Sequence, residues 1–248
     1  MKKDRKIKIV ILAAGKGKRM QSDLPKALSP LKGKYMIKHV IESISEIHDE
    51  KPYAIVGHMA ELVQKELGDL CFYILQKDQL GTGHAVSCAK GDCEDAEDIV
   101  VLSGDQPFIK AETIKNLIEK HLESDAKMTF TTTVLPNFEG WRNSFIAFGR
   151  ILRKNGEVIG IREFRDATEE ERQITEVNAG CYIFNAKWLW KNLEKIKNEN
   201  AQKEYYLTDL FKIASENGDK IETIKIEPHE ALGANTKEEL GILENFTV

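Results

Sequence analysis

Two short, uninterrupted runs of apolar residues constrain the fold of this 248-residue chain more than any other feature. Residues 9–13 read Ile-Val-Ile-Leu-Ala and residues 99–102 read Ile-Val-Val-Leu, so neither run has a polar side that could face water. A strand of this kind must be covered on both faces, which is typical of the central strands of a parallel sheet. The two runs therefore predict an α/β fold with helices on both faces of the sheet.

The rest of the first half agrees with this interpretation. From residue 7 to about residue 124, short β-rich runs alternate with helical periodicity, as they do in doubly wound proteins. We predict strands at residues 9–13, 53–56, 72–75 and 99–102 and an amphipathic helix over residues 37–47, with a second helix after Asp105.

After Met128 the pattern changes to strand-like pieces with few helices between them, which favours antiparallel pairing. We predict strands at 128–134, 145–148, 157–163, 180–184 and 221–226, and helices at 188–197, 207–216 and 236–244. The expected fold is one domain over residues 1–248, with halves of about 7–125 and 126–248 around a mostly parallel mixed sheet and a smaller antiparallel part.

Composition narrows the class of function. The net charge of −4 argues against a dedicated nucleic-acid binder, although a local group of cations could still hold a nucleotide. The four cysteines form no C-x-x-C pair, which suits a reduced, cytoplasmic protein. No apolar run approaches the ~20 residues of a membrane helix, and the run after the basic N-terminus is too short for a signal peptide. We therefore expect no membrane partner.

A loop rich in glycine and cations follows the first predicted strand. It runs from Gly15 through Gly17 and Arg19 to Pro25 and Lys26. Glycines at such a place let backbone N–H groups approach phosphate oxygens, and the cations add charge. Met20 stands where a dinucleotide fingerprint needs its third glycine, and it also breaks the spacing of a Walker A loop. The loop predicts a polyphosphate cradle, and a glycine-rich turn with solvated lysines is the alternative.

Two further segments follow predicted strands. Asp105, in Ser103-Gly104-Asp105-Gln106-Pro107, stands where a carboxylate could bind Mg²⁺ together with phosphate oxygens, and an ordinary Gly-Asp-x-Pro turn is the alternative. Gln76 and the segment 80–85 could read the edge of a nucleobase. We assign no catalytic role to His84, because a histidine at a helix start is more often structural.

Together these segments resemble the sugar-1-phosphate nucleotidyltransferases. The resemblance is strongest to the uridylyltransferase domain of the bifunctional bacterial enzyme that forms UDP-N-acetylglucosamine, and the stretch at 200–209, Asn-Ala-Gln-Lys-Glu-Tyr-Tyr-Leu-Thr-Asp, discriminates best. It covers about residues 7–243 and implies a Rossmann-like nucleotidyltransferase fold, with a nucleotide-binding first half and a sugar-binding second half.

The resemblance also implies roles for individual residues. Mg²⁺ would be bound by Asp105 and Asn235, and Arg19 would steady the pyrophosphate. The alternatives without a function in binding are a turn at Gly149, a solvated carboxylate at Glu163, a strand-end cap at Asn178 and a helix N-cap at Asn235. The uridine nucleotide would lie against Leu12, Ala13, Ala14, Gly15, Lys26, Gln76, Gly81 and Thr82, and the amino sugar against Gly149, Glu163 and Asn178, with Ser103 and Gly104 nearby.

The implied reaction is attack by the oxygen of a sugar 1-phosphate on the α-phosphorus of UTP, with release of pyrophosphate. Positioning and charge stabilisation serve such a transfer, so it needs no protein nucleophile. Arg19, Lys26 and Asp105 would carry catalysis, and the partners would be UTP and N-acetylglucosamine 1-phosphate.

The sequence departs from the family pattern in several places. Ser103 and Ala179 replace an aromatic Tyr and a Thr beside the predicted sugar pocket, Lys203 replaces a Gly, and residues 137–143 form an altered loop. Since no hexapeptide repeat follows, we expect no acetyl transfer. Another sugar, a CTP-dependent transferase and a non-catalytic sensor stay open as alternatives, as do a homo-oligomer and a separate acetyltransferase.

Overall fold

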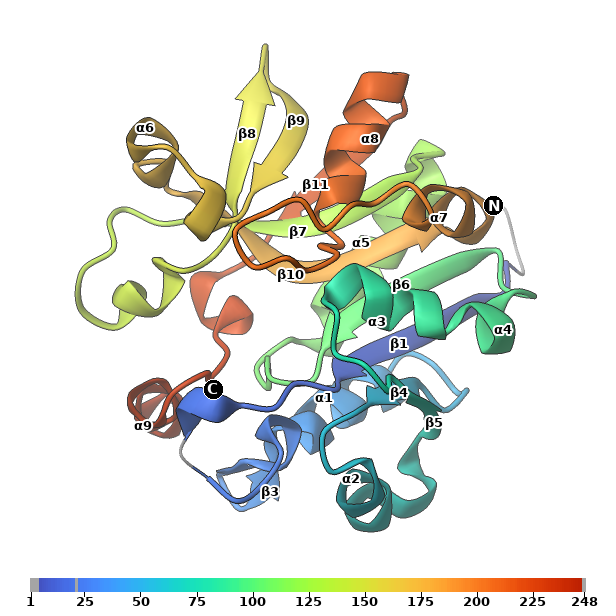
Figure 1. Cartoon of the computed structure of the whole chain (residues 1–248), viewed down its shortest axis with the longest axis vertical. Coiled ribbons are helices and arrows are strands. Elements are labelled where there is room, and N and C mark those ends of the chain that lie inside the picture. The colour runs from blue at the N-terminus through green and yellow to red at the C-terminus, as the bar shows by residue number, and fades with distance from the viewer. Residues whose placement is uncertain (1–4, 21, 247–248) are drawn as a thin grey trace.

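A mixed sheet forms the centre of the computed structural model, which describes residues 5–20 and 22–246 (Figure 1). Nine strands of these residues join in it, seven of them in the order β11-β7-β10-β6-β1-β4-β5, while β8 pairs with β10 and β9. The four strands that the first half contributes to this sheet, β1, β4, β5 and β6, are parallel, β10 is antiparallel to β6, β7 and β8, and β11 is parallel to β7. The predicted α/β class with a mostly parallel first half is confirmed.

The first half follows the predicted alternation of strands and helices. Its strands are β1 (Ile7–Ala13), β4 (Tyr53–Val56), β5 (Phe72–Leu75) and β6 (Asp98–Ser103), with a small hairpin of β2 (Pro30–Leu31) and β3 (Lys34–Tyr35). Its helices are α1 (Met36–Ser45), α2 (Ala60–Leu67), α3 (Thr82–Cys88), α4 (Lys90–Cys93) and α5 (Ala111–Ser124).

Strand β1 shows why its sequence is apolar throughout. Ile9 and Ile11 pack into the cluster that also holds residues of α1 and α5, whereas Val10 packs into the cluster with residues of α3, α7 and α8. Because successive side chains of a strand point to opposite faces, both faces of β1 are covered. The continuous run is thus a consequence of its central place in the sheet.

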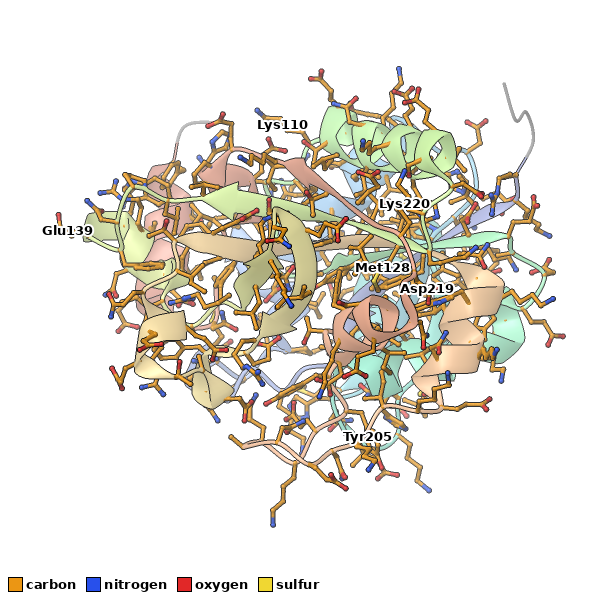
Figure 2. All side chains as sticks on the ribbon, turned by 90° about the horizontal axis from the view of Figure 1, so that it is seen from above. Lys110, Met128, Glu139, Tyr205, Asp219 and Lys220 are labelled. Atoms are coloured by element: carbon orange, nitrogen blue, oxygen red, sulfur yellow. The ribbon has the colours of Figure 1, made fainter. Side chains whose placement is uncertain are left out.

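The second half adds mostly antiparallel strands, one short helix and three longer helices. The strands are β7 (Met128–Val134), β8 (Arg150–Lys154), β9 (Glu157–Arg162), β10 (Glu176–Asn185) and β11 (Ile221–Lys225). The helices are α6 (Glu169–Arg172), α7 (Ala186–Leu193), α8 (Asp209–Asn217) and α9 (Lys237–Asn245). Short 3-10 turns complete the elements, and Met128 lies inside the molecule while Glu139 lies at its periphery (Figure 2).

The prediction of a strand at residues 145–148 is wrong. Residues Gly140–Phe145 form a 3-10 helix, and the chain continues in turns to Phe148. The cause is the buried guanidinium of Arg150, which donates to the carbonyl oxygens of Phe148 and Ile146 at 2.5 and 3.0 Å. A buried cation must be solvated by such acceptors, so the segment curls around Arg150 instead of extending.

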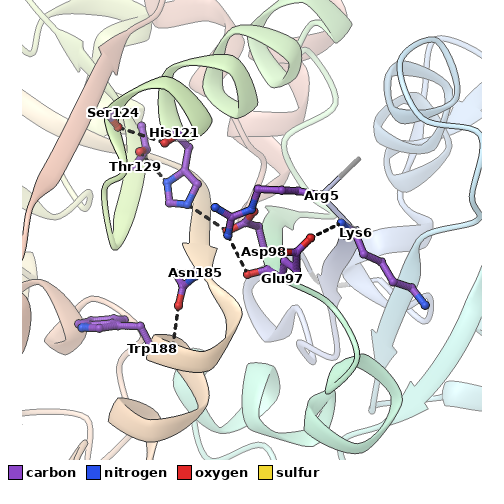
Figure 3. A network of polar contacts seen from close by, with 9 residues as sticks. All are labelled: Arg5, Lys6, Glu97, Asp98, His121, Ser124, Thr129, Asn185 and Trp188. Atoms are coloured by element: carbon purple, nitrogen blue, oxygen red, sulfur yellow. Dashed lines mark hydrogen bonds and ion pairs between the residues drawn. The ribbon is translucent and has the colours of Figure 1, made fainter. Parts of the chain in front are cut away.

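A network of polar contacts holds the end of the sheet where β6 begins (Figure 3). Asp98 has no exposed surface, and the guanidinium Nε of Arg5 lies 2.7 Å from its Oδ2. His121 of α5 lies 3.3 Å from the other oxygen of Asp98 and 2.9 Å from the hydroxyl of Thr129 on β7. The network thus joins β6, β7, α5 and the chain before β1.

Candidate active site

A cleft of about 1020 Å³ lies over the carboxyl ends of β1 and β6. Open α/β sheets bind their ligands at this edge, where loops from neighbouring strands meet. Its lining combines backbone of the glycine loop with side chains of both signs. The lining residues are Leu12, Ala13, Ala14, Gly15, Lys16, Gly17, Arg19, Lys26, Ala27, Gln76, Lys77, Asp78, Gln79, Leu80, Gly81, Thr82, Ala85, Ser103, Gly104, Asp105, Arg165, Gln202 and Glu204.

The glycine loop leaves β1 and turns back against Lys26. Gly17 has a φ of +57°, and a Cβ there would lie 3.0 Å from the Cβ of Lys26. The buried side chain of Met20, in a turn closed by its N–H to the carbonyl oxygen of Gly17 at 2.8 Å, anchors the loop in the core. Lys16 and Arg19 stay exposed beside the cleft, and Gln21 lies outside the described residues.

Three residues far apart in the chain meet where Lys26 and Asp105 line the cleft. The Nζ of Lys26 donates to the carboxylate of Asp105 and, at 2.5 Å, to the amide oxygen of Asn235. All three side chains are partly buried. Asn235 is not a helix cap, because the N-cap of α9 is Thr236, whose hydroxyl accepts from the N–H of Glu239. The structure thus brings together both metal ligands implied by the resemblance.

The oxygens of Asp105 and Asn235 suit a hard cation. Both approach a single atom, Lys26 Nζ, so both can approach one ion, and Mg²⁺ prefers oxygen ligands supplied by few protein groups plus phosphates and water. Within residues 5–20 and 22–246, no group of three or more His, Cys, Asp or Glu is placed to hold a metal. Nucleotide oxygens and water would therefore have to complete the coordination.

Another part of the cleft is built from the loop before α3 and from the stretch around Tyr205. The side-chain amide of buried Gln76 lies 3.2 Å from the carbonyl oxygen of Gly81 and 3.0 Å from the Nδ1 of His84. Tyr205 donates its N–H to the carbonyl oxygen of Leu80 and accepts from the N–H of Gly83, each at 2.8 Å. The stretch at 200–209 therefore holds the loop that carries Gly81.

The residues implied for the sugar lie together on the second half. The N–H of Asn178 donates to the carbonyl oxygen of Gly149 at 2.9 Å, and a Cβ on Gly149 would lie 3.5 Å from a carboxylate oxygen of Glu163. Asn178 is no strand-end cap, because it lies within β10 and its amide donates to the hydroxyl of Tyr182 at 2.6 Å.

Glu163 is half-buried, and it differs from a freely solvated carboxylate. It accepts the hydroxyl of Thr208 at 2.8 Å. Burial raises the pKa of Glu163, the bond from Thr208 opposes this, and the carboxylates of Asp209 and Asp166 add to the rise. A carboxyl held in this way can accept hydrogen bonds from a neutral, hydroxyl-rich ligand.

One departure from the family pattern has its side chain in the core and not in the cleft. Ala179 has no exposed surface and packs with Val177, Phe145 and Ala231 in a hydrophobic cluster. Its side chain therefore does not face the predicted sugar-binding residues as we had expected, because neighbouring residues of a strand point to opposite sides. Ser103, by contrast, does line the cleft.

Part of the cleft lining was not predicted from the sequence. Arg165, Gln202 and Glu204 face the cleft from the second half, and Lys16 faces it from the glycine loop. Arg165 stands two residues after Glu163, and Gln202 and Glu204 lie in the stretch at 200–209. Their closeness in sequence to residues already assigned to the site was the signal that could have predicted them. Among the described lining residues, Gly149, Glu163, Asn178 and Asn235 do not appear, so they border the 1020 Å³ cleft at most.

A cleft at the sheet edge, with a cationic glycine loop and facing carboxylate and amide oxygens, defines a nucleotide-handling α/β protein. Solved structures share the fold over nearly the whole chain. UDP-glucose pyrophosphorylase in complex with UDP-glucose matches with a TM-score of 0.74 at 17% identity, covering 98% of each chain. A chain described as a glucose-1-phosphate thymidylyltransferase from Bacillus anthracis gives 0.73 at 17% identity, covering 98% of this chain and 97% of its own.

Sequence comparison then gives the family. Residues 9–171 match the MobA-like NTP transferase domain, so the chain belongs to this family of nucleotidyltransferases. The bifunctional protein GlmU of Desulfitobacterium hafniense is 40% identical over 95% of the chain, and that of Clostridium novyi is 42% identical over 96%. The chain spans 51% of the length of each of these relatives. No helix in the described part of the chain is both long and apolar enough to cross a membrane.

Proposed function

We propose that this protein transfers UMP from UTP to N-acetylglucosamine 1-phosphate in a Mg²⁺-dependent reaction that releases pyrophosphate. The observation that carries the proposal is the meeting of Lys26, Asp105 and Asn235 at the wall of a cleft bordered by the glycine loop. The similarity to the GlmU proteins supports the choice of substrates.

The residues of this chain would divide the work along the cleft. Backbone N–H groups from Leu12 to Gly15 and the cations Arg19 and Lys26 would hold the triphosphate, and Gln76, Gly81 and Thr82 would hold the uracil. Because the Nε2 of Gln76 already contacts Gly81 and His84, its amide oxygen would be the group that accepts a hydrogen bond from the edge of the pyrimidine. The second half would contribute Gly149, Glu163 and Asn178 to the sugar.

Catalysis would rest on alignment and on charge. An oxygen of the sugar phosphate attacks the α-phosphorus, and the bond to the departing pyrophosphate breaks. Mg²⁺ bound by Asp105 and Asn235 would neutralise charge on the phosphate oxygens. Lys26 and Arg19 would stabilise the charge that develops on the leaving group, and such preorganised cations are an effective source of rate in a cleft with little water.

The test is a panel of nucleoside triphosphates, including UTP and CTP, against several sugar 1-phosphates, with and without Mg²⁺. We expect release of pyrophosphate to be fastest with UTP and N-acetylglucosamine 1-phosphate and to require the metal. Preference for another sugar or for CTP would overturn the proposed substrates, and no turnover with any pair would overturn the enzymatic function.

A further inference from the structure

The side chain of Gln106 ties together the segments that carry the site. It is 6% exposed, and its amide Nε2 donates to the carbonyl oxygens of Ala179 at 2.9 Å and Ala231 at 3.2 Å. An amide nitrogen has two hydrogens, so both are used. Ala179 follows Asn178 on β10, and Ala231 lies four residues before Asn235.

The surroundings of Gln106 fit its shape closely. Gly180 has a φ of +83°, and a Cβ there would lie 2.8 Å from the Nε2 of Gln106. A Cβ on Gly233 would lie 2.9 Å from the carbonyl oxygen of Asp105 and 3.5 Å from the Cγ of Gln106. The chain between Ala231 and Asn235 therefore packs directly against the backbone of Asp105.

This packing bears on the two oxygens that meet Lys26. Asp105 and Asn235 belong to segments that no shared strand or helix joins, yet their side chains reach the same atom. Gln106 is the neighbour of Asp105, and its amide reaches the segment of Asn235. At the other end of that segment, the N–H of Asn235 donates to the carboxylate of Glu239 at 2.5 Å, so the short chain is held at both ends.

We propose that Gln106 is a positioning residue, which keeps Asp105 and Asn235 close enough to bind one divalent cation together. The inference rests on the proposed function for the identity of the site, but it concerns the binding of the ion and can be measured without turnover. Groups that orient metal ligands typically change metal affinity or activity by about 10- to 100-fold when they are removed.

The experiment measures the binding of Mn²⁺ to the whole chain by electron paramagnetic resonance, in the presence of UTP and without a sugar phosphate, after subtraction of the Mn²⁺ that UTP alone binds in a titration without protein. Gln106→Leu keeps a side chain of similar size but removes both hydrogen bonds. We expect its dissociation constant for Mn²⁺ to rise by about tenfold or more. The Mg²⁺ concentration for half-maximal turnover should rise in parallel, and excess metal should restore kcat.

A matched control separates positioning from general loss of stability. Thr113 of α5 is also buried, and its hydroxyl donates to a carboxylate oxygen of Glu230, the neighbour of Ala231, at 2.6 Å. Thr113→Val should lower the free energy of unfolding to a similar extent but leave Mn²⁺ affinity within twofold of the unchanged protein. Asp105→Ala should abolish the binding.

The outcomes separate the two proposals. If Gln106→Leu binds Mn²⁺ as tightly as Thr113→Val does, Gln106 has only a structural role and the inference is wrong. The inference is also wrong if the unchanged protein binds no Mn²⁺ at millimolar concentration. Binding of Mn²⁺ without turnover on any substrate pair would overturn the proposed function alone, and the comparison of the two variants would still decide the role of Gln106.

Discussion

Replacement of Gly81 by alanine tests how the cleft is held in shape. Gly81 has φ +113° and ψ 176°, a region that is essentially open only to glycine, and entering it costs other residues about 1–3 kcal/mol. A Cβ would also lie 2.6 Å from the carbonyl oxygen of Tyr205 and 2.8 Å from its nitrogen. The backbone must therefore move and weaken the two hydrogen bonds between Tyr205 and the loop, each of which contributes about 1 kcal/mol.

The two effects together predict a loss of about 3–5 kcal/mol in the free energy of unfolding. Because the loop lines the cleft, a shift of this size should also raise the KM for UTP by about tenfold or more. Gly156→Ala is the matched control, since Gly156 has a φ of +84° but no atom within 4 Å of its added Cβ. It should cost only the backbone strain of about 1–2 kcal/mol and leave the KM unchanged.

Urea unfolding and steady-state kinetics measure both quantities on the same preparations. If Gly81→Ala were no less stable than Gly156→Ala and kept its KM for UTP, the contact with Tyr205 would not hold the loop. The loop that carries Gly81 would then keep its shape without the packing of Tyr205 against Gly81.

Other changes have equally defined outcomes. Asp98→Ala leaves the partly buried guanidinium of Arg5 and the buried ring of His121 without their carboxylate partner, so it should lower the free energy of unfolding by about 1.5–3 kcal/mol in a urea titration, with kcat unchanged. The pKa of Glu163 is raised in the folded protein, so ionisation of this carboxyl destabilises the fold as pH rises. Glu163→Gln should therefore be more stable than the unchanged protein in thermal unfolding at neutral pH. This difference in stability should vanish below the ordinary pKa of the carboxyl. Ser103→Tyr should change the ratio of kcat/KM between sugar phosphates by about tenfold, whereas Ala179→Thr should overpack the core and leave that ratio unchanged.

The elements of the fold that could be predicted are those whose structure is determined by residues close together in the sequence. The runs at 9–13 and 99–102 are apolar because both faces of a central strand are covered, and this requirement can be read from a few neighbouring residues. The segment at 145–148 looks like a strand by the same rule but winds around a buried cation at Arg150. Strand β8 was not predicted, although the Asn155-Gly156 dipeptide is a sequence signal for a β-hairpin. In the structure both residues have positive φ in the turn between β8 and β9.

The candidate site also contains residues that a local pattern predicts and residues that only the tertiary structure brings into place. Asp105 could be placed at the cleft because it follows a buried strand, which fixes its position without reference to other segments. Asn235 could not, because no spacing rule connects it to Asp105, and only the resemblance pointed to it. Ala179 shows the limit of that resemblance, since adjacency to Asn178 in sequence does not reveal which side of β10 a side chain faces.

Strand β6 runs from a polar network that stabilises the fold to the cleft that is proposed to bind the substrates. Asp98 begins the strand inside the buried polar network, and Ser103 ends it at the cleft, five steps of about 3.3 Å, or about 17 Å, away. Between them lie only the buried apolar residues 99–102, which give no polar route between the two ends. Effects at sites farther apart than about 10 Å usually add. In the double variant of Asp98 and Gln106, the changes in the free energy of unfolding and in the free energy of metal binding should each equal the sum of those in the two single variants. The reason is that the polar contacts at the two ends of β6 are not linked.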